Sequence, residues 1–176
     1  RRMADNVLSA SRADETEVLI LAQESQLTRF ANSYIHQNVA ESDCTVRVRA
    51  LVGQRTGVAS TNDVTPQGLA GVAARAEEAA RLQPANPESL PLPSPQPLKR
   101  VEAFSEATAS CPPVARAEGA RVICTLAREA GLAASGAFTT LAREIVLANS
   151  RGLFAYHPST AADLNTVIMG DDSSGY

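Results

Sequence analysis

The side chains that could carry out chemistry are few and scattered. The chain contains two histidines, His36 and His157, and three cysteines, Cys44, Cys111 and Cys124. Neither histidine has a second His, Cys or carboxylate three or four residues away, the spacing that places two metal ligands on one helix face. An odd number of cysteines without a CxxC spacing argues against a disulfide framework or a zinc knuckle. We therefore expect free thiols, and histidines on strand surfaces or, alternatively, lining a cleft against another domain.

Other motifs of catalysis and ligand binding are missing as well. The sequence has no G-x-S-x-G, no P-loop and no G-x-G-x-x-G. The run at 171–175 lacks the alternating ligands and terminal Glu of a calcium loop and is expected to be a turn. The acidic residues Asp14, Glu15 and Glu17 are expected in a solvated loop. On its own residues the chain offers no catalytic, cofactor-binding or metal site, and we expect it to be inactive and metal-free by itself.

Small polar residues and glycines indicate turns. Asn32 and Asn149 are expected at hairpin turns where the backbone is left-handed, with substrate contact as the lesser alternative. Gly53 and Gly57 are both expected to be turn glycines.

Size and charge narrow the class of protein. With 176 residues, of which 44% are hydrophobic, the chain suits one domain with a real core. Its net charge is −3, its arginines are scattered, and Lys99 is its one lysine, so nothing in the charge pattern favours nucleic acid. We find no signal peptide and no apolar run of transmembrane length, which predicts a cytoplasmic protein without membrane contact.

Strands are predicted from short apolar runs. Val46, Val48 and Ala50 alternate with Arg47 and Arg49, the period of a strand with one buried and one exposed face. A polar turn is expected at 24–26. The predicted strands cover 18–22, 27–33, 35–40, 45–52, 56–60, 133–140, 143–149, 152–158 and 161–169.

Helices are predicted from caps and periodicity. Apolar positions near a helical period favour a helix from about 2 to 11. Thr65 and Pro66 are a good N-cap and first helical residue for a helix running to about 82. A second such helix is expected at 113–130 with Gly131 at its end. Between them, 83–97 holds six of the ten prolines and reads as an extended linker.

An internal repeat organises these elements. The segment 27–60 is similar to 144–176, with Ala-Asn-Ser at 31–33 matching Ala-Asn-Ser at 148–150. We predict an α+β fold: a duplicated unit of one helix and four strands, in a mostly antiparallel sheet with helices packed on one face. Copy one covers about 1–82, the Pro-rich linker 83–99 and copy two about 113–176. A single sheet shared by both copies is favoured, because each alone would leave edges exposed.

The repeat resembles a known family. The stretch from Leu27 to Asn62, the Thr-Pro-Gln helix start and the final ANSRGLFAYHPSTAADLNTVIMGDDSSGY are similar to the amino-terminal domain of the TldD/PmbA family, long described as modulators of DNA gyrase. The resemblance covers nearly the whole chain and includes both copies in order.

The resemblance implies proteolysis. Family members form homodimers, or heterodimers of two related subunits, that enclose a cavity admitting unfolded peptides. The TldD-type subunit holds zinc on an HExxxH motif with a later Cys ligand, and PmbA-type (TldE) subunits lack the motif. The metal would polarise the scissile carbonyl and acidify its bound water.

This chain has no HExxxH, and Cys44, Cys111 and Cys124 do not match the ligand Cys. We therefore expect an amino-terminal portion whose carboxy-terminal metal-site domain is absent, and both ends of the chain look cut. The first hypothesis is the amino-terminal domain of a zinc metallopeptidase subunit, which helps to shape a dimeric cavity for unfolded peptides. The alternative is a non-catalytic PmbA/TldE-like scaffold or dimerisation module. Direct action on gyrase is unsupported by these residues.

Overall fold

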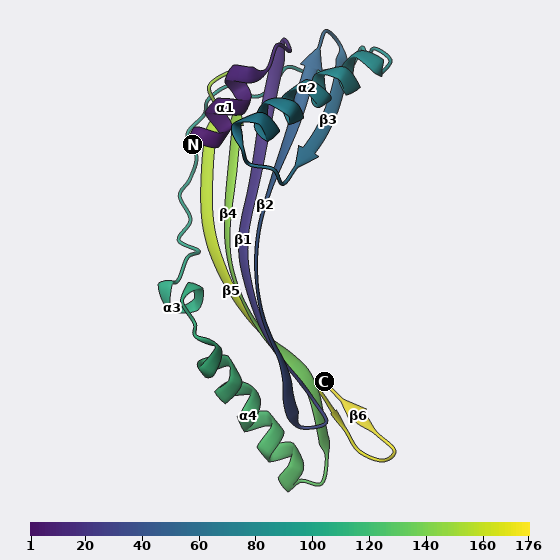
Figure 1. Ribbon diagram of the computed structural model, residues 1–176, viewed down its shortest axis with the longest axis vertical. Helices are drawn as coiled ribbons and strands as arrows, with labels where there is room; N and C mark the ends of the chain where they lie inside the picture. Colours follow the sequence, from purple (N-terminus) through teal and green to yellow (C-terminus); the bar gives the residue numbers. More distant parts are fainter. The chain divides into compact units, whose positions relative to one another are not determined.

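The computed structural model describes residues 1–176, which form four helices and six strands (Figure 1). The α+β class predicted from the sequence is confirmed. In chain order the elements are α1 (Arg2–Ala10), β1 (Glu15–Ala31), β2 (Tyr34–Val52), β3 (Arg55–Thr61), α2 (Pro66–Leu82), α3 (Glu106–Ala109), α4 (Pro113–Glu129), β4 (Ala133–Asn149), β5 (Phe154–Met169) and β6 (Ser174–Gly175).

All six strands belong to one sheet in the order β3-β2-β1-β4-β5-β6. The two central strands come from different copies of the repeat and run antiparallel. Ser33, just after β1, donates its N–H to the carbonyl of Ala134 near the start of β4, at 2.7 Å. Ser150, just after β4, donates its N–H to the carbonyl of Thr16 near the start of β1, at 2.8 Å. The shared sheet favoured by the sequence is therefore confirmed.

The number of strands per copy differs from the prediction of four. The polar turn expected at 24–26 lies inside β1, and the breaks expected at 41–44, 141–142 and 159–160 lie inside β2, β4 and β5. Side chains in these stretches are exposed or half-buried, so the apolar alternation lapses there while the strand continues. Copy one consequently has three strands, and copy two has two long strands and the two-residue β6.

The chain divides into two compact units, each of which draws on both copies of the repeat. Unit 1 comprises Arg1–Ala22, Asp43–Val101 and Glu144–Pro158. Unit 2 comprises Gln23–Ser42, Glu102–Arg143 and Ser159–Tyr176.

In unit 1, α1 and α2 pack on one face of the strands (Figure 1). The predicted N-cap of α2 is confirmed, because the Thr65 hydroxyl accepts a hydrogen bond from the N–H of Gly68 at 3.1 Å. The inward positions of β2 are the three that alternate with arginine in the sequence. The buried core consists of Ala4, Val7, Val18, Ile20, Val46, Val48, Ala50, Leu69, Val72, Ala73, Ala76 and Ala148.

Gly57 is not a turn glycine. It lies within β3, where an added Cβ would overlap the backbone of α2 at Ala76 and Ala80. Its missing side chain lets the helix backbone approach the strand directly, whereas the turn of the β2–β3 hairpin is made by Gly53, with φ of 59°. The prediction was right for Gly53 and wrong for Gly57.

In unit 2, α4 packs over a smaller apolar core made of Phe30, Ala120, Cys124, Ala127 and Ala134. The end of the helix is as predicted. Gly131 has φ of 71° and donates its N–H to Arg128, while Leu132 donates to Ala127 at 2.8 Å, which is a Schellman motif.

The start of α4 in unit 2 buries a cation. Arg116 is 2% exposed, and its Nη1 donates to Gln26 Oε1 at 2.7 Å and to the Cys111 carbonyl at 2.6 Å. Both acceptors are neutral, so this charge is held by hydrogen bonds alone.

The Pro-rich linker at 83–99 has no helix or strand, as expected, but it is anchored in unit 1. Leu92 is 3% exposed and donates its N–H to Glu15 Oε2 at 2.6 Å. Pro93 accepts a hydrogen bond at its carbonyl from Asn149 Nδ2 at 2.8 Å. The linker is therefore a packed part of unit 1 rather than a free spacer.

Candidate functional site

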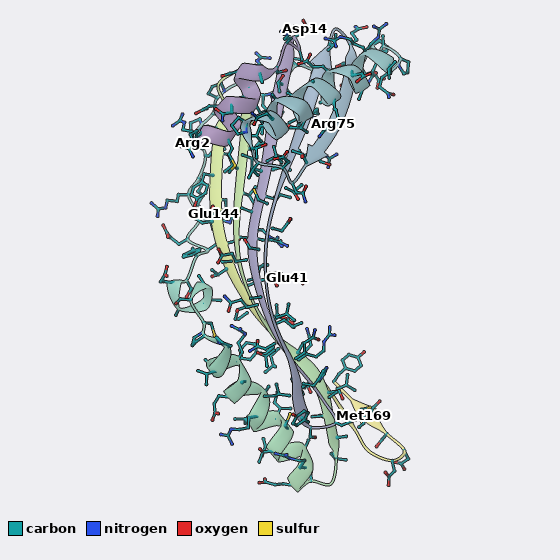
Figure 2. All side chains as sticks on the ribbon, viewed as in Figure 1. Arg2, Asp14, Glu41, Arg75, Glu144 and Met169 are labelled. Carbon is teal, nitrogen blue, oxygen red and sulfur yellow. The ribbon has the colours of Figure 1, made fainter.

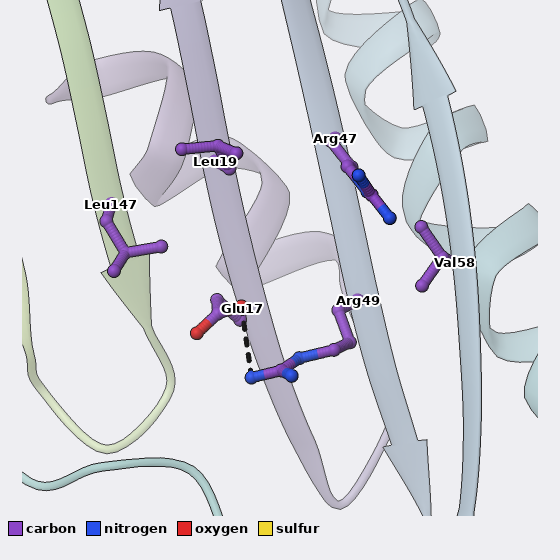
Figure 3. Close-up of a pocket in the computed structure, with 6 residues that line it drawn as sticks. All are labelled: Glu17, Leu19, Arg47, Arg49, Val58 and Leu147. Carbon is purple, nitrogen blue, oxygen red and sulfur yellow. Dashed lines mark ion pairs between the residues drawn. The ribbon is translucent and has the colours of Figure 1, made fainter.

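The face of the unit 1 sheet that α1 and α2 leave uncovered carries a pocket of about 260 Å³ (Figure 3). Four neighbouring strands supply its lining, which consists of Glu17 and Leu19 from β1, Arg47 and Arg49 from β2, Val58 from β3 and Leu147 from β4.

The strand period places these side chains on one face. On β1, Val18 and Ile20 enter the core, so their neighbours Glu17 and Leu19 point the other way. On β2, the same alternation turns Arg47 and Arg49 toward the pocket. In the β2–β3 register, Arg49 lies opposite Val58 and Arg47 opposite Ser60.

The two pocket arginines have different surroundings. Arg49 extends toward β1, where its Nη2 lies 3.1 Å from Glu17 Oε1, and its buried Nε has no hydrogen-bond partner. Arg47 is exposed, makes no ion pair, and extends toward Val58 on β3 (Figure 3). The lining therefore combines aliphatic surface with one positive charge in excess, which suits an acidic group on an extended or apolar carrier.

The lining contains no nucleophile and no general base positioned by a second group, so its chemistry is that of binding. The residues with catalytic potential in the sequence lie elsewhere and are not brought together. His36 lies on β2 in unit 2, and His157 lies on β5 in unit 1. No group of three or more His, Cys, Asp or Glu side chains in residues 1–176 is arranged to hold a metal ion.

The cysteines are free thiols. Burial raises the pKa of Cys44, and the nearby carboxylates of Asp43 and Glu144 raise this pKa further. Burial also raises the pKa of Cys124. Because the thiolate is the metal ligand and the nucleophile, both environments disfavour either role at neutral pH.

The acidic residues expected in a solvated loop have defined partners. Asp14 Oδ2 accepts the N–H of Gly53 at 2.7 Å. Glu15 holds the linker through Leu92, and Glu17 pairs with Arg49. The expectation was right for Asp14, which lies exposed in the loop before β1. It was wrong for Glu15 and Glu17, which belong to β1 and meet neighbouring segments across its face.

The two asparagines predicted at turns differ in backbone conformation and in burial. Asn32 has φ of 50° in the β1–β2 hairpin, which confirms the left-handed turn predicted there. Asn149 is 2% exposed, its φ is not positive, and its Oδ1 accepts N–H groups of Arg151 and Leu153 at 3.0 Å each. In that turn the positive φ falls on Gly152, at 91°. The expected turn at 171–175 is confirmed for residues 171–173, and the N–H of Gly170 bonds the carbonyl of Ser173 across it, but Ser174 and Gly175 form β6.

Sequence reasoning did not select Arg47 or the pocket as a site. The signal that could have found it was present, because arginines alternated with the core residues of β2. The sequence does not assign the β2–β3 register. It therefore does not show that Arg47 lies opposite Ser60 on β3. None of the helices is long and apolar enough to cross a membrane.

Comparison with family models gave one match. Residues 16–80 match the model described as PmbA/TldA metallopeptidase domain 1. This range begins at β1 and ends in α2, so it contains every residue of the pocket except Leu147. No curated protein sequence matched the chain.

Solved structures share the fold across almost the whole chain. TldE from Thermococcus kodakarensis has a TM-score of 0.85 at 18% identity, over 98% of this chain and 40% of that one. A proposed modulator of a DNA gyrase from Thermotoga maritima has a TM-score of 0.82 at 12% identity, over 98% and 40%. A proposed modulator of DNA gyrase from Bacteroides thetaiotaomicron has a TM-score of 0.78 at 16% identity, over 95% and 39%. The chain therefore spans about two fifths of the length of these structures.

Proposed function

We propose that this chain is the amino-terminal domain of a metallopeptidase subunit, from the premise that its residues 16–80 match the first PmbA/TldA metallopeptidase domain. In this role it helps to form a dimeric cavity that receives unfolded peptides. The observation that carries the proposal is the match to the metallopeptidase domain model, and the likeness of fold over nearly the whole chain supports it.

Zinc, which the family implies, does not fit the residues present. His36, His157 and the three cysteines lie apart, and Cys44 and Cys124 have raised pKa values that favour the neutral thiol. A metal site would therefore have to come from residues outside the 176 described, and no catalytic step is assigned to this chain. Its contribution is to bind and orient a peptide on the sheet of unit 1.

The test uses the protein encoded by the complete reading frame, purified alone and with any related subunit of the same genome. We expect stoichiometric zinc and chelator-sensitive cleavage of an unfolded casein substrate. The 176-residue chain, purified in parallel, is expected to bind no zinc and to cleave nothing. A complete protein that has neither zinc nor peptidase activity, alone or with its related subunit, would contradict the proposal.

A second candidate is a TldE/PmbA-like subunit without a metal of its own, and the likeness to TldE from Thermococcus kodakarensis favours considering it. The same experiment separates the two. Zinc in the isolated complete subunit identifies the metal-bearing type. Zinc and cleavage found only after mixing with a related subunit identify the scaffold type.

A further inference from the structure

The outer edge of β3 in unit 1 is an unpaired strand edge. β3 has β2 as its one neighbour in the sheet, and Val52 and Arg55 flank the two-residue loop between them. In a hairpin with a two-residue loop, the flanking pair exchanges both backbone hydrogen bonds, and bonded and non-bonded pairs then alternate. Thr56, Val58 and Ser60 occupy the non-bonded positions, so their N–H and C=O groups point away from β2.

A side-chain contact supports this assignment independently. Arg75 on α2, labelled in Figure 2, donates from Nη2 to the Ser60 carbonyl at 3.4 Å, which requires that carbonyl to face outward. No other segment of the chain hydrogen-bonds to the outward groups of Thr56 or Val58. Arg75 therefore shields one end of the edge through a single long hydrogen bond, and the rest of the edge is open.

The edge also lacks the features that usually prevent strand pairing. Natural edge strands are protected by proline, by charged side chains, by bulges or by great shortness. From Thr56 to Thr61 the strand has no proline and no charge, and its pairing with β2 continues without a bulge. The one charge of β3 is on its first residue, Arg55, and the six residues that follow are enough for a further strand to pair along them.

Arg47 supplies a charge beside this edge. It lies opposite Ser60 in the register and extends toward Val58 on β3 (Figure 3). A strand added to β3 would lie two strand spacings, about 10 Å, from β2. Because Ser60 is small, the Arg47 guanidinium can reach across β3 to meet a carboxylate on the added strand. Arg49 extends the other way and is already paired with Glu17.

We propose that the outer edge of β3 binds an extended peptide segment by strand addition, and that Arg47 selects segments carrying an acidic side chain on the pocket face. The choice of a peptide as ligand rests on the proposed function. The binding site and its preference for acidic residues go beyond that function. Peptide main-chain groups pair with Thr56, Val58 and Ser60, and a glutamate or aspartate of the peptide pairs with Arg47.

Amide hydrogen exchange of the 176-residue chain tests the strand addition directly. The probe is a short peptide of alternating valine and threonine with one central glutamate. Peptide binding should slow exchange at the N–H groups of Val58 and Ser60 and leave those of Gly57 and Ala59, already bonded to β2, unchanged. Unchanged exchange at Val58 and Ser60 with saturating peptide would overturn the proposal, and so would slowing that follows protein concentration without peptide, which would indicate a second copy on the edge.

The charge preference is tested with a matched peptide in which glutamine replaces the glutamate. We expect the glutamate peptide to bind about threefold more tightly at low salt, with the preference shrinking as salt is added. Arg47→Gln should abolish the preference. Arg55→Gln removes the same charge from β3 at a position on the opposite face and should retain it. Equal affinity of the two peptides for the unmodified chain would refute the role of Arg47.

The edge itself is blocked by Val58→Pro, which removes an outward N–H without removing a bond to β2. We expect at least a tenfold loss of peptide affinity, with an unchanged circular dichroism spectrum. If this variant does not fold, Val58→Lys places a charge on the edge instead and should give the same loss. Conversely, Arg75→Met should improve binding by freeing the Ser60 carbonyl. These binding measurements need no peptidase activity. The strand-addition proposal can therefore fail while the proposed function holds, and the proposed function can fail while strand addition holds.

Discussion

The tripeptide Ala-Asn-Ser ends both β1 and β4, and its serine has the same contacts at the two ends. Ser33 donates its N–H to the carbonyl of Ala134 and accepts the N–H of Ala134 at Oγ, at 2.7 and 3.0 Å. Ser150 does the same with Thr16, at 2.8 and 3.0 Å. Each serine thus joins the end of one copy's strand to the start of the other copy's strand.

The asparagine of the same tripeptide has two different roles. Asn32 is exposed and contributes a left-handed backbone to a tight turn. Asn149 is buried, and its side chain bonds two N–H groups of its turn and the carbonyl of Pro93 in the linker. The difference follows from the surroundings, because the longer β4–β5 turn and the packed linker provide partners that the β1–β2 turn lacks. Two residues that match in a sequence repeat therefore occupy equivalent positions in the fold, but they need not make equivalent contacts.

The largest difference should appear when the asparagines are removed. Asn149→Ala deletes three hydrogen bonds at a buried position and should lower the free energy of unfolding by about 3 kcal/mol. Asn32→Ala places alanine in a left-handed turn and should cost about 1 kcal/mol. Urea unfolding of both variants measures the difference. Equal losses would mean that the two asparagines act alike after all.

The serines should behave as a matched pair. Ser33→Ala and Ser150→Ala each leave one buried backbone N–H, of Ala134 or Thr16, without its acceptor. Each should lower the free energy of unfolding by about 1–2 kcal/mol, and the two losses should agree within about 0.5 kcal/mol. Threonine at Ser150 retains the hydroxyl and serves as the control, whereas at Ser33, whose φ is 59°, a β-branched residue would strain the backbone. A large difference between the pair would break the equivalence of the two strand junctions.

A smaller effect separates backbone from side chain at Asn32. Glycine adopts a left-handed conformation without strain, so Asn32→Gly should change the free energy of unfolding by no more than about 0.5 kcal/mol. Asn149→Gly should be as damaging as Asn149→Ala, because glycine supplies none of its hydrogen bonds. Thermal unfolding of the two glycine variants checks this contrast, and a strongly destabilised Asn32→Gly would reveal a side-chain role for Asn32.

The smallest effect extends the comparison to one thiol in each unit. Burial raises the pKa of both thiols, and the Asp43 charge raises that of Cys44 further, whereas the Arg128 charge opposes the rise at Cys124. Asp43→Asn removes a negative charge, so the pKa of Cys44 should fall and its alkylation by iodoacetamide near pH 8 should become faster. The rate at Cys124 should not change. Mass spectrometry of the modified peptides gives both rates, and a Cys44 rate that does not rise would exclude the proposed influence of Asp43.

Much of the fold follows from local signals in the sequence. Thr65 and Pro66 mark the start of α2, Gly131 marks the end of α4, and the alternation around Val46 identifies the buried face of β2. The lengths of the strands could not be predicted from such local signals. Polar residues at 24–26 predicted a turn, but a strand whose side chains there are exposed or half-buried tolerates them while its backbone stays paired.

The candidate site was less accessible to sequence reasoning. Arg47 was visible as an outward residue, but its relation to Ser60 and to the β3 edge depends on the hairpin register. The sequence predicts a turn at Gly57, because nothing local distinguishes a glycine that ends a strand from one that admits a helix backbone. Such features are set by contacts between segments rather than by the residues themselves.

The bonds between Thr16 and Ser150 also have a consequence for synthesis of the chain. These residues are 134 positions apart, so the partner of β1 emerges from the ribosome roughly 7–27 s later at ordinary elongation rates. During that interval the hairpin of β1 and β2 has an open inner edge and cannot complete its pairing. Contacts of such high sequence separation form slowly, so the nascent β1–β2 hairpin is exposed to aggregation until β4 has been made.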